Sequence, residues 1–496
     1  INVGGVKPGS VADKGGVTSL EPASRPYESL QRYDPDTNVL ETLFQVRGQG
    51  VLRVVDYMPW SDDSRATIHE VHRRVECFES ATDLNISFDP RFDYGRESTR
   101  LETSEHGVLA RGSSGDTLAM VLGADVQWGE RDAGGLQACH TMQPGQRLWC
   151  VLSWGAPRPE PLQTYRPFDC LRYTRAAWRE WSRKLGYEGP WRDHVMRSAL
   201  LLKALIYAPT GAMVAAPTTS LPEWLGGHRN WDYRFAWTRD AALAIRAANL
   251  IGYGHEAREF FHFVRDVVDD EAPLKIMYNI HGAEVPEEQE LAHLAGFQGS
   301  GPVRIGNGAR DQLQFDTPGY LLDAALAYQR SGGTLTLRVW RRLRAVVEMA
   351  RQQANQPDHG IWEPRMGARM NLHSQLMSWV TLDRGRRIAP LFGEASLARQ
   401  WGQDADALSR TLLQRGLDRS GRRFASAYGT DEVDSTLLLL GSYGLLDAAD
   451  PRMVATREHV VRELGDRGFL YRYRNDDGVG GAEGAFLLCG FWLAET

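Results

Sequence analysis

The sequence predicts a multidomain β + α protein in which an N-terminal antiparallel β-sandwich precedes a two-layer barrel of α-helices. Its 496 residues are enough for two to four domains at roughly 100–200 residues each. Up to about residue 165, short apolar stretches are broken by Gly, Pro, Asp and Ser, whereas the later part shows helical periodicity. We therefore assign 1–165 to a β-sandwich domain, 166–190 to a linker helix and 191–496 to a helical barrel domain.

The first part contains strand-like segments with no helix between them. Residues 39–47 and 51–58 are rich in apolar and β-branched residues and are joined by Gly48-Gln49-Gly50, which predicts a hairpin. Strands that follow one another without helices pair in antiparallel sheets, and this favours a sandwich. The first thirty residues are rich in Gly, Ser and Pro and predict no element. The other strand-like segments are 67–78, 84–88, 118–122 and 148–154.

The second part alternates between two kinds of helix. Segment 394–415 carries one apolar stripe, whereas 192–207 is apolar over most of its circumference and should be buried between layers. Such alternation is typical of a two-layer α barrel. The residues of the stripe are Leu397, Trp401, Ala405, Leu408 and Leu412. The predicted helices are 192–207, 238–251, 254–269, 318–330, 334–352, 372–385, 394–415, 433–446, 451–464 and 483–495.

Composition and charge exclude several classes of protein. Hydrophobic residues make up 42% and charged residues 24%, the ordinary balance of a globular protein. The net charge of −6 argues against binding to nucleic acid or to an anionic membrane surface, because both require a basic excess. No apolar run approaches the roughly 20 residues that span a bilayer. We therefore expect neither a nucleic-acid nor a membrane partner, while a homo-oligomer stays open.

The five cysteines are odd in number, widely spaced and without a C-x-x-C pair. This pattern fits neither a disulfide framework nor a structural zinc site, and it favours a reducing compartment. We expect a cytoplasmic protein without a metal or cofactor. The chain begins at Ile1 rather than Met, so secretion stays open as an alternative.

Several catalytic motifs are missing from the sequence. It contains no G-x-x-x-x-G-K-[ST], no H-E-x-x-H and no G-x-S-x-G. The nearest approach to a dinucleotide loop, at 478–483, has Glu483 where the third glycine belongs. Phosphate-loop, zinc-protease, serine-hydrolase and dinucleotide chemistry therefore have no sequence support.

What remains is a set of carboxylates beside aromatic residues in long loops, and such loops often carry function. Aromatic side chains in loops suit the apolar faces of sugar rings. Glu363 follows Trp362, and apolar packing there would keep a carboxyl group protonated as an acid. Glu483 begins a predicted helix, where the helix dipole favours the ionised form that a base requires. Glycoside hydrolysis uses two such carboxyl groups. A surface acid at Glu363 and an ordinary first-turn residue at Glu483 remain alternatives.

Three segments carry a resemblance to a known family. They are 227–240, which contains N-W-D-Y-R-x-x-W-x-R-D, 359–365 and 480–486. Together with 287–307 they resemble the bacterial and archaeal branch of glycoside hydrolase family fifteen, which includes glucoamylases, glucodextranases and trehalases. The resemblance extends over roughly residues 30–496.

The resemblance implies a β-sandwich followed by an (α/α)6 barrel, with the active site in the funnel of loops between paired helices. Glu363 matches the general acid and Glu483 the general base of an inverting mechanism, in which the carboxyl groups lie about 6.5–9.5 Å apart. Arg239 and Asp240 match the pair that binds the outer hydroxyls of the terminal glucose. Tyr233 matches the aromatic residue beneath the reacting ring. The other expected substrate-binding residues are Trp237, Trp362 and Arg365, with Gln314 as a further candidate.

The implied activity is an exo-acting, inverting α-glucoside hydrolase that releases β-glucose from α-glucans or α-gluco-oligosaccharides, as glucoamylases and glucodextranases do. An α,α-trehalase is the alternative, because the same motifs serve both activities. A sugar phosphorylase and a non-catalytic carbohydrate-binding relative are more distant alternatives. The sequence departs from the family at Pro318-Gly319-Tyr320, where many relatives carry an acidic residue. It also offers ten helices where the family barrel has twelve, so we expect a barrel shortened at its C-terminal end.

Overall fold

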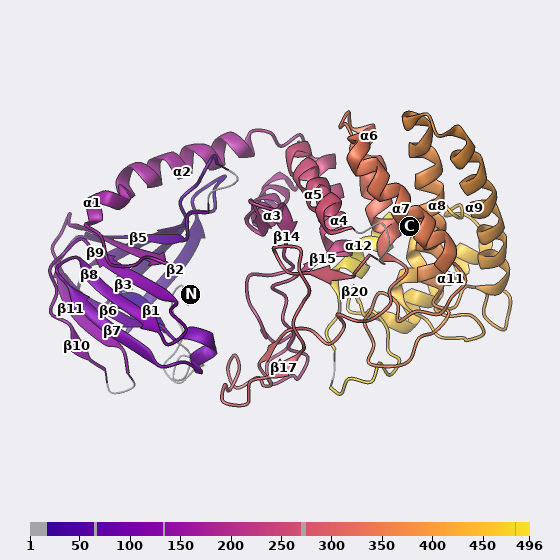
Figure 1. The fold of residues 1–496 in the computed structure, drawn as a ribbon. Coiled ribbons are helices and arrows are strands. Elements are labelled where there is room, and N and C mark those ends of the chain that lie inside the picture. The colour runs from indigo at the N-terminus through magenta and orange to yellow at the C-terminus, as the bar shows by residue number, and fades with distance from the viewer. Residues whose placement is uncertain (1–16, 64–66, 132–133, 269–273, 482) are drawn as a thin grey trace. The chain divides into compact units, whose positions relative to one another are not determined.

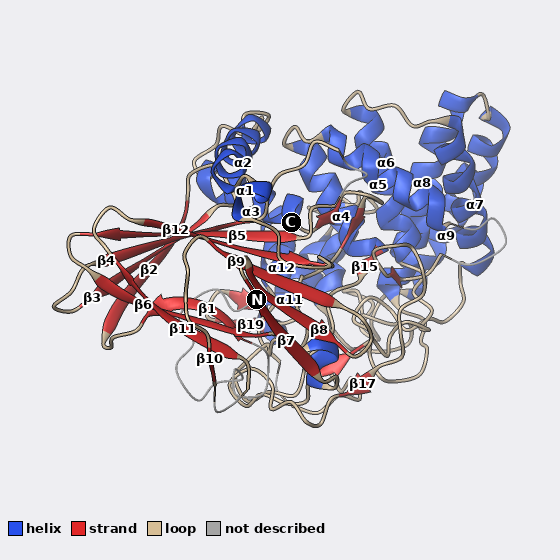
Figure 2. Cartoon of the chain, turned by 60° about the vertical axis from the view of Figure 1, so that its left-hand side comes forward, coloured by secondary structure: helices blue, strands red, loops and turns tan. Residues whose placement is uncertain are grey.

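The computed structural model describes residues 17–63, 67–131, 134–268, 274–481 and 483–496. The chain divides into two compact units. The first is Ile1–Ala204 together with His293–Gly299, and the second is Leu205–Ala292 together with Ser300–Thr496. Strands dominate the first unit and long helices the second (Figure 2). The segment predicted as a linker helix belongs to the first unit.

The first unit contains two antiparallel sheets. Its strands are β1 (Val17–Pro22), β2 (Tyr27–Tyr33), β3 (Leu40–Val46), β4 (Val51–Tyr57), β5 (Glu70–Phe78), β6 (Thr82–Asp89), β7 (Thr99–Ser104), β8 (Gly107–Gly112), β9 (Thr117–Leu122), β10 (Gly129–Glu130), β11 (Leu136–Met142) and β12 (Arg147–Trp154). One sheet has the order β1-β6-β11-β10 and the other β2-β3-β4-β5-β12-β9-β8-β7. The predicted hairpin is confirmed as β3 and β4, in which Gln45 pairs with Val51.

The core of the first unit lies between the two sheets. Leu84 and Ile86 of β6 meet Leu52 and Val54 of β4 in one cluster of fully or almost fully buried side chains. These positions alternate along each strand, as expected when one face of a sheet is buried. The opposite face of β4 is also covered, because Val55 packs against Leu171 of the helix α2 (Pro167–Ser182). The short helix α1 (Leu162–Tyr165) precedes it.

The second unit is built from two layers of helices (Figure 1). The helices α4 (Thr238–Leu250), α6 (Thr317–Arg330) and α8 (Leu372–Ile388) pack side by side, with α6 between the other two. Helices α6 and α8 are buried on nearly all sides. Helices α5 (Gly254–Val267), α7 (Leu337–Gln353) and α9 (Ala395–Arg415) bury one face each and form the outer layer. The predicted two-layer arrangement of helices is therefore confirmed.

The second unit ends with shorter elements. They are the 3-10 helix η4 (Ser435–Leu438) and the helices α10 (Leu439–Ser442), α11 (Pro451–Leu464) and α12 (Leu487–Glu495). Two-residue strands pair within the loops, namely β13 (Ile206–Tyr207) with β14 (Ala212–Met213), β15 (Ala236–Trp237) with β16 (Met277–Tyr278), β17 (Gln289–Glu290) with β18 (Arg304–Ile305) and β19 (Gly465–Asp466) with β20 (Phe469–Leu470).

Three helix predictions were wrong in detail. The segment predicted as one helix over 433–446 holds only η4 and α10, because Gly444 adopts a left-handed conformation with φ +79°. The last helix begins at Leu487 rather than 483, after the glycine-rich run 478–484. Helix α3 (Arg192–Ala204) was expected to be buried all round, but Leu201 is 56% exposed. The buried residues of α3 are Met196, Ala199 and Leu200.

Candidate active site

The candidate site is built on the loops that lead into α4, α8 and α12. Strand pairing of β15 with β16 fixes the chain just before α4, and Arg239 and Asp240 then fall in the first turn of that helix. Glu363 lies in the loop before α8 and Glu483 in the loop before α12. The structure thus brings segments that are far apart in the sequence to the N-terminal ends of three helices.

Three donors surround one oxygen of Glu363. Its Oε1 accepts hydrogen bonds from Nε1 of Trp237 at 2.8 Å, from Nη2 of Arg239 at 3.3 Å and from Nε2 of Gln314 at 3.3 Å. The apolar environment expected for Glu363 is therefore wrong, since its neighbours are polar donors. Glu363 has φ +55°, a left-handed conformation that is costly for a residue with a Cβ and that recurs at functional sites.

Arg239 is buried and lies among acceptors. Its Nη1 donates to Oε1 of Gln314 at 2.7 Å, and its Nε lies 3.4 Å from Oδ1 of Asp240. Oδ2 of Asp316 is 3.9 Å from its Nη1. Burial lowers the pKa of Arg239, but the carboxylates of Asp240, Asp316 and Glu363 outweigh it, so the net shift is upward. The guanidinium is therefore held charged beside Glu363.

Asp240 and Tyr233 complete this side of the site. The side chain of Asp240 is 46% exposed, yet surrounding protein raises the pKa of its carboxyl by burial, and Arg239 partly offsets this. Burial likewise raises the pKa of Tyr233, and the nearby carboxylates of Glu223 and Glu363 add to it. The ring of Tyr233 lies 6.2 Å from that of Trp237.

Glu483 is held by two guanidinium groups. Its Oε1 is 3.4 Å from Nη1 of Arg229 and forms a close ion pair with Nη2 of Arg472. Oε2 is buried and has no hydrogen-bond partner within the described part of the chain. Glu483 was expected at the start of a helix, but α12 begins four residues later. The positive charge beside its carboxylate comes from Arg229 and Arg472 rather than from the helix dipole. One oxygen is fixed and the other is left for a further ligand.

The cations around Glu483 are functional candidates that the sequence analysis missed. Arg229 also pairs with both oxygens of Asp477, at 2.7 and 3.1 Å. The guanidinium of Arg472 lies 5.5 Å from the ring of Trp362, next to Glu363 in the chain. Arg229 directly precedes the Asn-Trp-Asp motif and could have been found there. Arg472 stands in a Tyr-Arg-Tyr run that carries no such signal.

Trp362 is in the site, whereas Arg365 is engaged beside it. Nε1 of Trp362 donates to Oδ2 of Asp434 at 3.0 Å. Arg365 instead donates to Oε2 of Glu288 at 2.8 Å and stacks on the ring of Trp231 at 5.2 Å. Seven of the eight predicted site residues therefore gather around the two carboxylates. They are Tyr233, Trp237, Arg239, Asp240, Trp362, Glu363 and Glu483.

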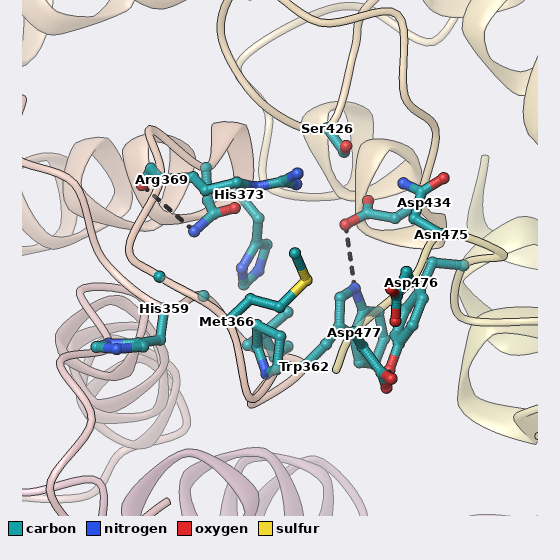
Figure 3. A pocket seen from close by; sticks show the side chains of 16 residues that line it. His359, Trp362, Met366, Arg369, His373, Ser426, Asp434, Asn475, Asp476 and Asp477 are labelled. Atoms are coloured by element: carbon teal, nitrogen blue, oxygen red, sulfur yellow. Dashed lines mark hydrogen bonds between the residues drawn. The ribbon is translucent and has the colours of Figure 1, made fainter. Parts of the chain in front are cut away.

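A cavity with about 650 Å³ of empty space, part of it open to solvent, lies on one side of Trp362 (Figure 3). Trp362, Met366 and His373 line it together with Asp434, and Ser426 lies across the cavity from Trp362 in this view. Among the described residues no cluster of three or more His, Cys, Asp or Glu has a geometry that could hold a metal ion. The described helices include none long and apolar enough to cross a membrane.

Comparison with known proteins identifies the family. The model of glycosyl hydrolases family 15 matches residues 189–496, and that of the trehalase-like N-terminal domain matches residues 10–153. A trehalase of Thermoplasma volcanium is 35% identical over 97% of this chain and 77% of its own length. A trehalase of Mycolicibacterium smegmatis is 38% identical over 98% of this chain and 77% of its own length.

The fold prediction is confirmed by a solved structure. A bacterial glucoamylase complexed with acarbose aligns with a TM-score of 0.66 over 93% of this chain and 73% of its own, at 13% identity. The antiparallel sheet domain followed by a glucoamylase-like (α/α)6 barrel fold is thereby shown. The chain belongs to glycosyl hydrolases family 15 and is a glycoside hydrolase.

Proposed function

We propose that the protein is an α,α-trehalase that cleaves its substrate with inversion. The relatives that match nearly the whole chain are named trehalases, which supports this alternative over the glucoamylase-like activity expected first. The N-terminal match to a trehalase-like domain supports it as well.

In this proposal Glu363 is the general acid and Glu483 the general base. Donors from Trp237, Arg239 and Gln314 occupy one oxygen of Glu363, which leaves the other to meet the glycosidic oxygen. The unpartnered Oε2 of Glu483 is the observation that carries the proposal, because a base that activates water needs a free lone pair.

The glucosyl ring that reacts would lie between Tyr233, Arg239 and Asp240. The exposed carboxylate of Asp240 accepts bonds from outer hydroxyls, while Arg239 stays fixed behind it. The face of Tyr233 supports the oxocarbenium charge that develops in the transition state. We also propose that Trp237 and Trp362 contact the substrate, whereas Arg365 would have to leave Glu288 and Trp231 to reach it.

Trehalose, maltose and isomaltose distinguish the activities when glucose release is measured for each. We expect the highest kcat/KM on trehalose, with free glucose rather than a sugar phosphate as product. Glu363→Gln and Glu483→Gln should each lower kcat roughly 10²–10⁴-fold. Glu394→Gln is a matched control, because Glu394 also accepts from an indole, Trp340, and an arginine, Arg344. Faster release from maltose than from trehalose would favour the glucoamylase-like activity instead.

A cytoplasmic location is part of the proposal. All five cysteines are free thiols, which fits a reducing compartment. The acidic net charge of −6 supports a protein that acts without nucleic acid or a membrane surface. Size-exclusion chromatography with light scattering would establish whether it forms a homo-oligomer.

A further inference from the structure

The cavity beside Trp362 is lined by neighbours of both carboxylates of the candidate site, although neither Glu363 nor Glu483 lines it itself. Trp362 and Pro364, which flank Glu363 in the chain, both line it. Asp477 lines it too, and Asp477 pairs with Arg229, which in turn contacts Glu483. Tyr233, Arg239 and Asp240 are not among its lining residues. The cavity is therefore separate from the place proposed for the reacting ring but next to the bond that would break.

Two buried polar atoms at this cavity lack partners. His373 is 4% exposed and Ser426 5%, and both line the cavity. Nδ1 of His373 and Oγ of Ser426 have no hydrogen-bond partner among the residues that the structure describes. Leaving a buried polar group unpaired costs about 1–3 kcal/mol, so two at one cavity indicate a ligand that pairs with them.

The imidazole of His373 is held in place and neutral. Its Nε2 is 3.0 Å from the hydroxyl oxygen of Tyr320, so Nδ1 is the ring nitrogen that has no partner among the described residues. Burial, helped by the charge of Arg239, lowers the pKa of His373 to about 3. A neutral imidazole and a serine hydroxyl suit the hydroxyl groups of a sugar.

The remaining walls favour an uncharged ring. Ile361, Trp362, Met366 and Tyr473 present apolar or aromatic surface, as sugar-binding sites do. The carboxylates that line the cavity are Asp434, Asp476 and Asp477. Its cation Arg369 already bonds to Glu432 at 2.7 Å. Asp477 is paired with Arg229, so Asp434 and Asp476 remain as the acidic groups that oppose a phosphate ester.

We propose that this cavity binds the leaving glucosyl unit of an unphosphorylated disaccharide, with Nδ1 of His373 and Oγ of Ser426 bonded to its hydroxyls. The inference rests on the proposed function, since the leaving unit is the second ring of trehalose. Glu363 gives its proton to the glycosidic oxygen, water that loses a proton to Glu483 bonds to the anomeric carbon as the glycosidic bond breaks, and the leaving unit departs from the cavity as free glucose. His373 and Ser426 thereby become specificity determinants.

The test compares trehalose with α-glucosyl fluoride, whose leaving group is too small to fill the cavity. In Ser426→Ala the ratio of kcat/KM for trehalose to that for the fluoride should fall roughly 3- to 10-fold, the effect of one lost hydrogen bond. Ser378→Ala is the matched control, because Ser378 is equally buried but donates to the carbonyl oxygen of Ser374 in its own helix. That variant should leave the ratio unchanged.

Two variants of His373 separate binding from folding. In His373→Gln the side-chain amide takes the position of Nε2, so the bond to Tyr320 is preserved and the group at Nδ1 is lost. In His373→Asn the amide takes the position of Nδ1, so the bond to Tyr320 is lost instead. We expect His373→Gln to lower the ratio and His373→Asn to keep it closer to that of the wild type. Trehalose 6-phosphate should be hydrolysed at least 10-fold less efficiently than trehalose.

An unchanged ratio in both Ser426→Ala and His373→Gln would overturn the assignment of the cavity. Equal efficiency on trehalose and its 6-phosphate would overturn the exclusion of charged substrates. Failure to hydrolyse either trehalose or α-glucosyl fluoride would overturn the proposed function itself, and so the two failures are distinguishable.

Discussion

The indole N–H of Trp237 donates a 2.8 Å hydrogen bond to Oε1 of Glu363, which lies 126 residues further along the chain. This bond joins the loop before α4 to the loop before α8. It fixes one oxygen of Glu363, and in the proposed function the other oxygen meets the substrate. The orientation of the proposed acid therefore depends on a residue of the motif around Tyr233.

Trp237→Phe removes this donor while most of the apolar volume stays. We expect kcat on trehalose to fall roughly 10-fold, because the bond from a donor to a charged or reacting carboxyl is worth about 1.5–3 kcal/mol. Trp340→Phe is the control, since Trp340 makes a similar bond of 3.0 Å to Glu394 in the outer layer. It should lower the melting temperature without changing kcat. Equal kcat in both variants would contradict the role given to Trp237.

Arg472→Lys tests the cation beside Glu483. Lysine keeps the charge but loses the planar fork that pairs with Glu483 and lies against the ring of Trp362. We expect kcat to fall roughly 10- to 100-fold with little change in KM, because the base would lose its orientation. Arg344→Lys, which affects only the pair with Glu394, is the matched control. A change confined to KM would show that Arg472 binds substrate rather than positioning Glu483.

Asp477→Asn should destabilise the second unit. Asp477 and Arg229 form a buried pair with two hydrogen bonds, and removal of the Asp477 charge leaves Arg229 with the longer contact of 3.4 Å to Glu483. We expect a loss of roughly 3 kcal/mol in the free energy of unfolding, measured by urea denaturation at pH 7. Activity on α-glucosyl fluoride should fall too, because Arg229 also contacts Glu483. Full stability in Asp477→Asn would show that the pair contributes nothing net.

The raised pKa of the buried Asp316 carboxyl predicts that the stability of the protein depends on pH. Burial raises its pKa to about 7, the charge of Arg239 opposes this, and the carboxylates of Asp358 and Glu363 add to it. The folded state therefore holds the proton more tightly than the unfolded state does. Its contribution to stability is complete below about pH 4 and is lost as the pH rises through about 7.

Asp316→Asn removes this titration. Relative to the wild type, the variant should gain stability between pH 4 and pH 8, by at most roughly 4 kcal/mol. Urea denaturation of both proteins at several pH values measures the difference. A difference in stability that does not change with pH would contradict the raised pKa of Asp316.

The sequence was sufficient for the regular parts of the fold. Strands such as β4 and β6 alternate between the core and the other face of the sheet, and this period is visible in the residues. Helices α6 and α8 are buried on nearly all sides, and α8 buries polar residues such as Ser374, Gln375 and Asp383 as well as apolar ones. Strands β1, β2, β7, β8, β10 and β11 were missed, and the first two follow a run rich in Gly, Ser and Pro.

The site could be predicted where its residues fall within the segments that resemble the family, which are 227–240, 359–365 and 480–486. Tyr233, Trp237, Arg239 and Asp240 fall in one motif, and the family resemblance identified them. The donors to Glu363 and the cations on Glu483 come from distant segments, so no local pattern links them. Glu483 was expected in the first turn of a helix, where the helix dipole would favour its ionised form. It lies before that helix instead, because α12 begins at Leu487, after Gly481 and Gly484. Tertiary contacts, rather than local sequence, set the charge around both carboxylates.

The central claim is that Glu363 and Glu483 hydrolyse trehalose with inversion, and the anomers formed test it most directly. Proton NMR of freshly mixed enzyme and trehalose, recorded before mutarotation, should show α-glucose from the leaving unit and β-glucose from the attacked unit in equal amounts. Glu483→Gln should abolish both signals while the protein remains folded. Formation of α-glucose alone would contradict inversion, and an intact, folded wild type that releases no glucose would contradict the proposed activity.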